Sequence, residues 1–414
     1  MAHPELVRIV HDHSYQAYLT QFKISANIDR RWNVDAYTFK DGTPSIQVMV
    51  GPMGSEEELQ ALPPHIGVMP FWISSQFNRD FSAVIFGVAE IANALRRRER
   101  SRGPLVERLI AACPYCELRQ DKDGGKGTTR TVGEPNIPQI IGKSIGGDDG
   151  VDEMVLLGAH SFEAVAALRK YMKVVPVTAT PLFAEYVREE LFQHEGTEKV
   201  ENVMRLDPTN VRIVALDKGS LQQNVVFSQM LDLDPADHVI AFDKTRKGEN
   251  MVDKCALIYG DMTDLEGKDI IIYDDIIDTY GSIDATVESL KDKFHCRSIT
   301  VLATHGVLSH PGRRNIVQAL LKNHSIDRLV MTDSLPRANY LFDDDVLEQF
   351  ITIIPTASIL GSITGDLARG SYEEIISPDY QLANFILDPL DKEDMWNYFQ
   401  ASIAKKEKIK VFES

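Results

Sequence analysis

Residues Ile271–Ile283 read IIYDDIIDTYGSI, and the chain changes character sharply within this stretch. An apolar run is followed at once by two acidic residues, Asp274 and Asp275, and Asp278 comes three positions later. The apolar run is typical of a buried strand, and the apolar spacing over residues 283–294 is typical of one face of a helix. The acidic and small residues are therefore expected to form the turn between a strand and a helix.

This turn has the composition of a binding site for a phosphorylated sugar. Its small and polar residues are Thr279, Tyr280, Gly281 and Ser282. They would present backbone N–H groups and hydroxyls at the N-terminus of the helix, where phosphate groups bind readily. Carboxylates repel a phosphate, so Asp274 and Asp275 fit beside it if they bind sugar hydroxyls or hold a cation. A ribose phosphate would supply partners for both kinds of group.

The overall composition narrows the class of partner. The chain has 414 residues, 43% of them hydrophobic, and a formal net charge of −17. This length suits two domains or one large one, and the apolar content is enough for sizeable cores. Proteins that bind nucleic acid normally show a basic face, and the sequence has no Lys/Arg-rich block beyond the short run Arg96–Arg98. We therefore expect no nucleic-acid partner, and we expect metal ions or local cations to accompany any phosphate.

The cysteines and the hydropathy pattern indicate a soluble protein of a reducing compartment. Cys113 and Cys116 form a Cys-x-x-Cys pair, but a zinc site needs a second pair, which Cys255 and Cys296 do not form. Two buried thiols at the end of a strand are the favoured interpretation. The N-terminus lacks the features of a signal peptide, and no apolar run approaches the ~18 residues of a membrane-spanning helix. We expect a cytoplasmic protein with no membrane partner.

Short apolar runs alternate with amphipathic segments along the chain. The runs expected to form buried strands are Val151–Leu157, Val211–Leu216, His238–Phe242, Asp269–Tyr273 and Ser298–Ala303. Helical apolar spacing occurs between such runs, for example over residues 84–95. This alternation indicates an α/β fold with mostly parallel sheets flanked by helices. In such folds ligands gather at the carboxyl ends of strands, where the turn after Tyr273 would lie.

The turn and several other segments resemble one known family. An apolar strand followed by Asp-Asp-x-x-Asp-Thr-x-Gly-Ser is similar to the phosphoribosyl-binding signature of type I phosphoribosyltransferases and of phosphoribosyl pyrophosphate (PRPP) synthetases. Further segments resemble PRPP synthetase motifs in that family's order: Phe39–Gly42, Asn78–Phe81, Pro114–Tyr115, Arg119–Lys122, Leu157–His160, Pro181–Tyr186, Asp217–Ser220, Lys244–Arg246, Gly260–Asp261, Thr304–Ser309 and Thr332–Pro336. Simple phosphoribosyltransferases lack the Arg-Gln-Asp and Lys-x-Arg segments, which makes them a distant alternative. The chain is thus identified as a divergent member of the PRPP synthetase (ribose-phosphate pyrophosphokinase) family.

The resemblance implies a fold and a domain organisation. It implies two tandem phosphoribosyltransferase-like (Rossmann-like) α/β domains, the first at residues 1–178 on the ATP side. The second would occupy residues 179–380, with the ribose-phosphate loop at 273–283, and residues 381–414 would form a C-terminal extension. Family members assemble as dimers and larger rings, often hexamers, so a dimer-based homo-oligomer is implied.

The implied activity is that of a ribose-phosphate diphosphokinase of nucleotide biosynthesis. The 1-hydroxyl of ribose 5-phosphate would attack the β-phosphorus of ATP and release AMP, with Mg²⁺ as the cofactor. Such a transfer depends on positioning and charge neutralisation more than on covalent chemistry. By resemblance, Lys244 and Arg246 form the catalytic pair, on a mobile loop that closes over the phosphates.

The resemblance also assigns the binding residues. ATP would be bound by Phe39, Asp41, Arg119, Gln120 and His160. The metal would be held by His160 and Asp217. Ribose 5-phosphate would be bound by Asp217, Asp274, Asp275, Asp278, Thr279, Tyr280, Gly281 and Ser282.

Several positions depart from the family pattern. They are Thr43 in place of a Glu in the adenine loop, Gly158 in place of the Asp of Asp-x-His, Ser220 in place of a Gly, and Tyr280 in place of a small residue of the phosphate loop. Two alternatives therefore stay open beside the active enzyme. One is a non-catalytic paralogue that regulates active subunits, and the other is diphosphoryl transfer to a larger ribose-5-phosphate compound such as ADP-ribose. Retention of Lys244 and Arg246 favours the active enzyme.

Overall fold

The computed structural model of the chain has two compact units. The described residues are 4–9, 16–26, 30–38, 44–49, 65–71, 81–96, 106–116, 137–159, 162–192, 206–216, 218–248, 251–260, 264–322, 325–335, 349–370 and 372–375. The first unit contains the described residues of Met1–Thr178 and of Pro355–Asn397, and the second contains those of Ala179–Ile354. No helix among the described residues combines the length and the apolar character needed to cross a membrane.

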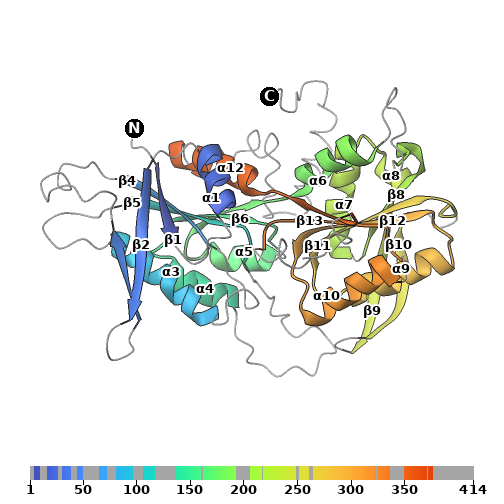
Figure 1. Ribbon diagram of the computed structural model, residues 1–414, viewed down its shortest axis with the longest axis horizontal. Coiled ribbons are helices and arrows are strands. Elements are labelled where there is room, and N and C mark those ends of the chain that lie inside the picture. Colours follow the sequence, from blue (N-terminus) through green and yellow to red (C-terminus); the bar gives the residue numbers. More distant parts are fainter. Residues whose placement is uncertain are drawn as a thin grey trace, which may run out of the picture. The chain divides into compact units, whose positions relative to one another are not determined.

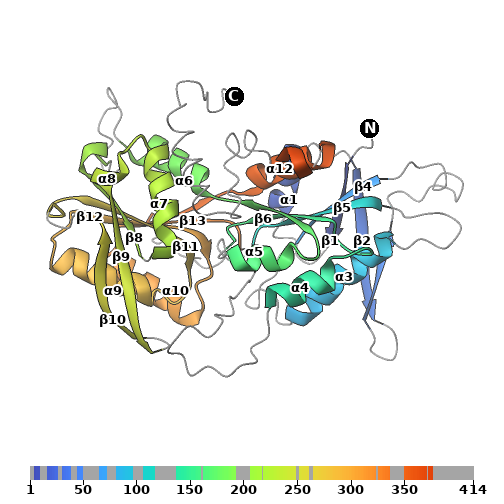
Figure 2. The same ribbon diagram turned by 180° about the vertical axis from the view of Figure 1, so that it is seen from behind.

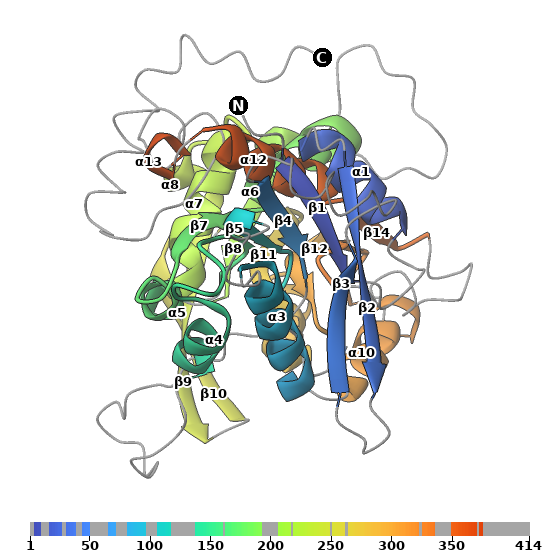
Figure 3. The ribbon, with the colours of Figure 1, turned by 90° about the vertical axis from the view of Figure 1, so that its left-hand side faces the viewer.

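The first unit is a sheet with helices on both faces (Figures 1 and 3). Its strand order is β3-β2-β1-β4-β5-β6-β7, in which β2 and β3 pair antiparallel and the other described neighbours pair parallel. The strands are β1 (Pro4–Ile9), β2 (Arg30–Thr38), β3 (Pro44–Met49), β4 (His65–Pro70), β5 (Val106–Cys113), β6 (Glu153–Leu157) and β7 (Lys173–Val177). The helices are α1 (Gln16–Ala26), α3 (Phe81–Arg96), α4 (Ile137–Ile145), α5 (Phe162–Leu168), α12 (Ala357–Arg369) and α13 (Tyr372–Ile375).

The two covered faces explain why the central strands of this unit are apolar along their length. Helices α3 and α4 lie on one face of the sheet, and α1 and α12 lie on the other (Figure 3). Strand β6 is buried at every position, as expected for a parallel strand between two helical layers. Cys113, which ends β5, and Cys116 are buried thiols. This confirms the interpretation of the Cys-x-x-Cys pair as buried thiols at a strand end.

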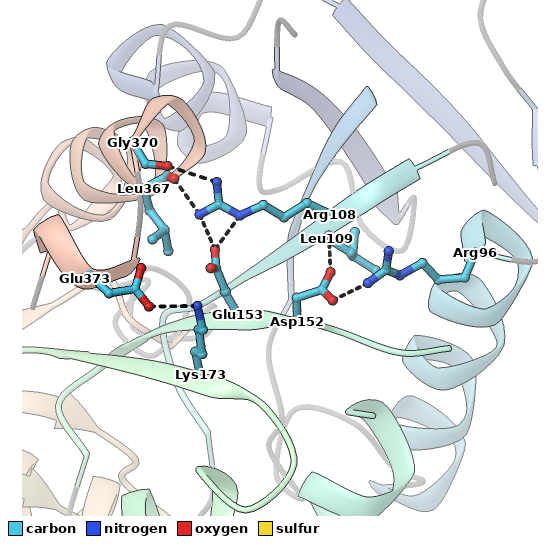
Figure 4. A network of polar contacts seen from close by, with 9 residues as sticks. All are labelled: Arg96, Arg108, Leu109, Asp152, Glu153, Lys173, Leu367, Gly370 and Glu373. Carbon is cyan, nitrogen blue, oxygen red and sulfur yellow. Dashed lines mark hydrogen bonds and ion pairs between the residues drawn. The ribbon is translucent and has the colours of Figure 1, made fainter. Parts of the chain in front are cut away.

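A network of charged groups ties α12 to the strands of the first unit (Figure 4). Arg108 on β5 donates to Glu153 Oε2 on β6 at 2.9 Å and 2.5 Å. It also donates to the carbonyl oxygens of Leu367 at 2.7 Å and Gly370 at 3.1 Å. A cation suits these carbonyls because the last C=O groups of a helix have no intrahelical partner and carry partial negative charge. Arg108 therefore stabilises both the buried carboxylate and the end of α12.

The second unit repeats the design (Figures 1 and 2). Its strand order is β10-β9-β8-β11-β12-β13-β14, with β9 and β10 antiparallel and the other described neighbours parallel. The strands are β8 (Val211–Ala215), β9 (Val239–Gly248), β10 (Met251–Tyr259), β11 (Asp269–Ile277), β12 (Ser298–Gly306), β13 (Arg328–Thr332) and β14 (Ile351–Ile354). The α-helices are α6 (Thr180–Tyr186), α7 (Lys218–Met230), α8 (Pro235–His238), α9 (Gly281–Asp292) and α10 (His310–Val317). Helices α9 and α10 lie on one face of the sheet, and α6 to α8 lie on the other.

The two sheets have equivalent strand orders, and each has an antiparallel pair at one edge. The central strand is β4 in the first sheet and β11 in the second. This internal repeat is not visible in the sequence. In each half the helix after the last strand belongs to the other unit: α6 follows β7 but packs against α7, and α12 follows β14 but packs against α1. The structure thus divides the chain at Thr178/Ala179 and returns it to the first unit at Pro355, whereas the family resemblance implies boundaries at residues 178 and 380.

The five predicted apolar runs all form strands, at β6, β8, β9, β11 and β12, which confirms the α/β fold. Three of these strands, β9, β11 and β12, continue beyond the predicted apolar runs. The reason is pairing, because backbone hydrogen bonds to a neighbouring strand can extend past the apolar core. The expected extension at residues 381–414 lies outside the described residues.

Candidate functional site

The acidic pair lies at the carboxyl end of the central strand of the second sheet. Strand β11 pairs with β8 up to Ile272 but with β12 as far as Ile277. Asp274 and Asp275 therefore belong to the last part of the strand. The prediction that placed them in the turn after the strand is wrong. Both are half-buried, and the backbone N–H of Asp275 donates to Asp274 Oδ1 at 3.0 Å. Two carboxylates thus lie at the strand end where α/β proteins bind ligands.

The turn that follows leads directly into α9. Tyr280 is the N-cap residue and has a left-handed backbone, with φ 69° and ψ −11°. Its carbonyl oxygen accepts the N–H groups of Ile283 at 3.0 Å and Asp284 at 2.9 Å, which starts the helix. The first N–H groups of a helix have no intrahelical acceptor and favour anions. Thr279 and Gly281 are exposed beside this helix start, so a phosphate group could reach it.

The Tyr280 side chain points into the core and not toward a ligand. It is 3% exposed and packs in the hydrophobic cluster that contains Ile277, Ile283 and Leu308. Burial raises the pKa of its hydroxyl well above the usual range. A left-handed backbone is uncommon for a bulky residue, and here the buried ring holds it in place. Tyr280 therefore adds a ring to the hydrophobic core next to the turn, while its backbone is still the N-cap of α9.

Asp278 has a different environment from the acidic pair. One of its carboxylate oxygens, Oδ1, accepts the backbone N–H of Ser309 at 3.1 Å. Ser309 is the N-cap residue of α10, the helix after the neighbouring strand β12. The third acid of the motif thus connects two successive strand–helix turns of the sheet. The family resemblance implies a role in sugar binding for Asp278, and no pattern in the sequence indicates this bond.

The strand before the acidic pair is fixed by residues that sequence analysis did not single out. Tyr273 is fully buried, with its hydroxyl 3.1 Å from Thr180 Oγ1 and its ring 5.1 Å from the rings of Phe183 and Phe227. Asn224 Nδ2 donates to the Tyr273 carbonyl oxygen at 2.9 Å. Because these partners come from α6 and α7, they could not be paired with Tyr273 from sequence spacing. They hold the backbone rigid immediately before Asp274.

The predicted catalytic pair lies on a strand. Lys244 and Arg246 belong to β9, opposite Cys255 and Val252 of β10 in an antiparallel pair. The expected phosphate-closing loop is therefore a two-stranded ribbon in this structure. Lys244 and Arg246 are two residues apart on β9, and the pairing opposite them is irregular between Val252 and Lys254 of β10. Their side-chain positions, like that of Ser282, are outside the described part of the chain.

The remaining predicted site residues fall outside the described residues. They are Phe39, Asp41, Arg119, Gln120, His160 and Asp217. Gly158 is described, with φ 58° and its N–H bonded to the Val177 carbonyl at 2.8 Å. Glycine adopts this left-handed conformation at little cost. Within the described part of the chain, no three His, Cys, Asp or Glu side chains gather in a way that could hold a metal ion.

Comparison with known proteins supports this fold. Residues 253–343, which include the acidic turn, match the family described as the phosphoribosyl synthetase-associated domain. The chain is 28% identical over 214 residues to ribose-phosphate pyrophosphokinase of Bifidobacterium longum, across 51% of this chain and 54% of the relative. It is 28% identical over 247 residues to the enzyme of the same name from a Marinomonas species, across 59% and 65% of the two chains.

A solved structure extends the likeness to the whole fold. The phosphoribosylpyrophosphate synthetase of Mycobacterium smegmatis matches with a TM-score of 0.62 and 17% identity, over 89% of this chain and 99% of that chain. The structure is thus a pair of tandem phosphoribosyltransferase-like α/β units. In sequence, the chain is similar to ribose-phosphate pyrophosphokinases over about half of its length. The sequence matches span less than two thirds of the length of these two curated relatives.

Proposed function

We propose that this protein is a ribose-phosphate diphosphokinase, which transfers the diphosphoryl group of ATP to the 1-hydroxyl of ribose 5-phosphate. The observation that carries the proposal is the end of β11, where two half-buried carboxylates precede a turn that opens into the N-terminus of α9. Asp274 and Asp275 suit the ribose hydroxyls as hydrogen-bond acceptors, and the N–H groups of the helix start suit the 5-phosphate. The names of the related proteins support the same reaction.

The proposed reaction is a single phosphoryl-type transfer. The 1-hydroxyl oxygen forms a bond to the β-phosphorus, the bond from that phosphorus to the α,β-bridging oxygen breaks, and AMP leaves while the hydroxyl proton passes to water. Lys244 and Arg246 are proposed to neutralise charge on the transferred group, and Arg suits this because its fork meets phosphate oxygens bidentately.

Mg²⁺ is the proposed cofactor, and it neutralises charge on the phosphates when bound. It normally takes one or two protein carboxylates together with substrate phosphates and water. Asp217 and His160 are the ligands that the family resemblance proposes. The half-buried pair Asp274 and Asp275 fits the same demand for oxygen donors close to a sugar phosphate. The protein is further proposed to be a cytoplasmic homo-oligomer that binds ATP and ribose 5-phosphate.

The test is AMP release from Mg-ATP by the purified protein, with and without ribose 5-phosphate. AMP release that requires ribose 5-phosphate, and that falls on the order of 100-fold in Lys244→Ala, would support the proposal. A folded protein that binds ribose 5-phosphate but releases no AMP would be a regulatory paralogue. AMP release with ADP-ribose but not with ribose 5-phosphate, followed by mass spectrometry of the product, would identify a larger acceptor.

A further inference from the structure

Residues 308–315, which include the start of α10 and the two residues before it, pack against the turn between β11 and α9. The backbone N–H of Leu308 donates to the Ile277 carbonyl oxygen at 3.1 Å. Asn315 Nδ2 donates to the Thr279 carbonyl oxygen at 2.9 Å. Together with the bond from Ser309 to the intervening acid, these hydrogen bonds hold each residue from Ile277 to Thr279. The turn is therefore braced along its length by one neighbouring segment.

The brace requires a close approach of two backbones. A Cβ atom at Gly312 would collide with the carbonyl oxygen of Asp278, so this position of α10 needs glycine. Leu308 has φ 40°, which is uncommon for a residue with a side chain, and it is buried at 3% exposure. Left-handed backbones thus occur on both sides of the contact, at Leu308 and at Tyr280. Such conformations persist only where the surrounding structure holds them, and they cluster at functional sites.

Asn315 acts on the part of the turn that faces the proposed phosphate. The Thr279 carbonyl and the Tyr280 N–H belong to one peptide unit, which is planar and trans. In a trans peptide the C=O and N–H groups point in opposite directions. A hydrogen bond that holds the carbonyl toward Asn315 therefore directs the Tyr280 N–H to the opposite side.

We infer that Asn315 is a positioning residue for the phosphate-binding turn, which it serves by fixing the Thr279–Tyr280 peptide. The inference rests on the proposed function, because it takes the 5-phosphate of the sugar as the ligand of this turn. In this role Asn315 acts through the turn and not by direct contact with the substrate. Its loss would weaken ribose 5-phosphate binding more than it slows the chemical step.

Three variants test this assignment. Asn315→Asp keeps the shape of the side chain but removes the amide donor, whereas Asn315→Gln keeps an amide donor on a longer stem. The matched control is Asn210→Asp, because Asn210 Nδ2 also donates to a backbone carbonyl, that of Gly267, at 3.0 Å. Asn210 precedes β8 at the opposite end of the strands from the site, and both asparagine bonds lie in exposed positions.

The measurements are the Kd of ribose 5-phosphate alone, the KM and kcat of AMP release, and amide hydrogen exchange of residues 278–283. We expect Asn315→Asp to raise Kd and KM roughly fivefold to tenfold, the size of one lost hydrogen bond, with a smaller change in kcat. Exchange of the turn should quicken in Asn315→Asp, Asn315→Gln should recover part of the affinity, and Asn210→Asp should match the unmodified protein.

The outcomes separate this inference from the proposed function. Unchanged Kd and unchanged exchange in Asn315→Asp would overturn the positioning role. An equal rise in Kd for Asn210→Asp would also overturn it, because the effect would then be one of general stability. If the unmodified protein shows no binding of ribose 5-phosphate and no AMP release, the proposed function fails. The exchange of residues 278–283 then still decides whether Asn315 orders the turn.

Discussion

The central strands of the two sheets occupy the same place but end in different chemistry. In the second unit β11 ends in two half-buried carboxylates and a turn into α9. In the first unit β4 ends at Pro70 and is followed by Phe71, which is 3% exposed and bonds through its N–H to the Ala112 carbonyl at 3.0 Å. The same topology thus supports an apolar strand end in one unit and a polar one in the other.

This difference shows that the fold supplies a place for a ligand but not the ligand chemistry. Both units nevertheless share the way in which a helix is fixed. In the first unit the Tyr18 hydroxyl is 3.2 Å from Oγ1 of Thr356, which precedes α12. In the second unit the Tyr273 hydroxyl is 3.1 Å from Oγ1 of Thr180, which begins α6. The second tyrosine is followed directly by the acidic pair, so in the second unit this support lies next to the candidate site.

The largest expected effect concerns the acidic pair. Replacement of Asp274 and Asp275 together by Asn should lower ribose 5-phosphate-dependent AMP release on the order of 100-fold, because the sugar hydroxyls and any bridging cation would lose their charged partners. The first unit offers a matched pair, Asp148 and Asp149, which are exposed before β6 at the other end of the strands. The same double substitution there should leave the rate unchanged. Equal losses in both double variants would remove the distinction between the two units.

An intermediate effect is expected for the stability of each sheet. Arg108→Met should lower the free energy of unfolding by roughly 3 kcal/mol, because it leaves Glu153 buried without its cation and frees the end of α12. Arg297→Met is the counterpart in the second unit. It should lower the free energy of unfolding by about 1 kcal/mol, because Arg297 is half-exposed. Its partner Asp269 would still accept the hydroxyl of Ser298, at 2.6 Å between the two oxygens.

Denaturant unfolding of the two arginine variants, with the unmodified protein as the reference, measures both values. A cost for Arg297→Met as large as that for Arg108→Met would contradict the importance of burial in this comparison. The structural reason for the difference is the exposure of the two arginines, because the carboxylates of both pairs are buried and only Arg297 is half in solvent.

The smallest expected effect is a difference in pH dependence between the units. Burial outweighs the attraction of Arg108 and raises the pKa of Glu153 above its ordinary 4.5. Burial, with the charge of Arg212 as the next cause, lowers the pKa of His238 below 6.5. The folded first unit therefore holds a proton on Glu153 more tightly than the unfolded chain does, so this contribution to stability falls as pH rises above 4.5. The contribution of His238 falls as pH drops below 6.5, because the unfolded chain binds that proton more tightly.

Hydrogen exchange of β6 and β8 amides, corrected for intrinsic rates between about pH 5 and 8, would follow the two units separately. Glu153→Gln should flatten the profile of β6 and His238→Asn that of β8. If the stability of β6 and that of β8 changed with pH in the same direction, burial would not control the protonation of Glu153 and His238.

Local sequence determined the strand and the helix on either side of the acidic residues. The apolar run before Asp274 and the helical spacing after Ile283 predicted a strand and a helix, and the structure has β11 and α9 there. Sequence spacing could not pair Arg108 with Glu153, because the two lie 45 residues apart and meet through adjacent strands. Nor could it predict that Lys244 and Arg246 lie on a paired strand, since pairing with β10 depends on a partner segment.

The sequence by itself thus determined the α/β class, the resemblance to PRPP synthetases and the cluster of acids after Tyr273, because hydrophobic periodicity and motif chemistry are properties of neighbouring residues. Only the tertiary structure decided that the two sheets repeat one strand order and that the Tyr280 ring is buried. It also decided that Asn315 holds the Thr279 carbonyl. These features depend on which distant segments pack together, and packing of distant segments leaves no local pattern in the chain.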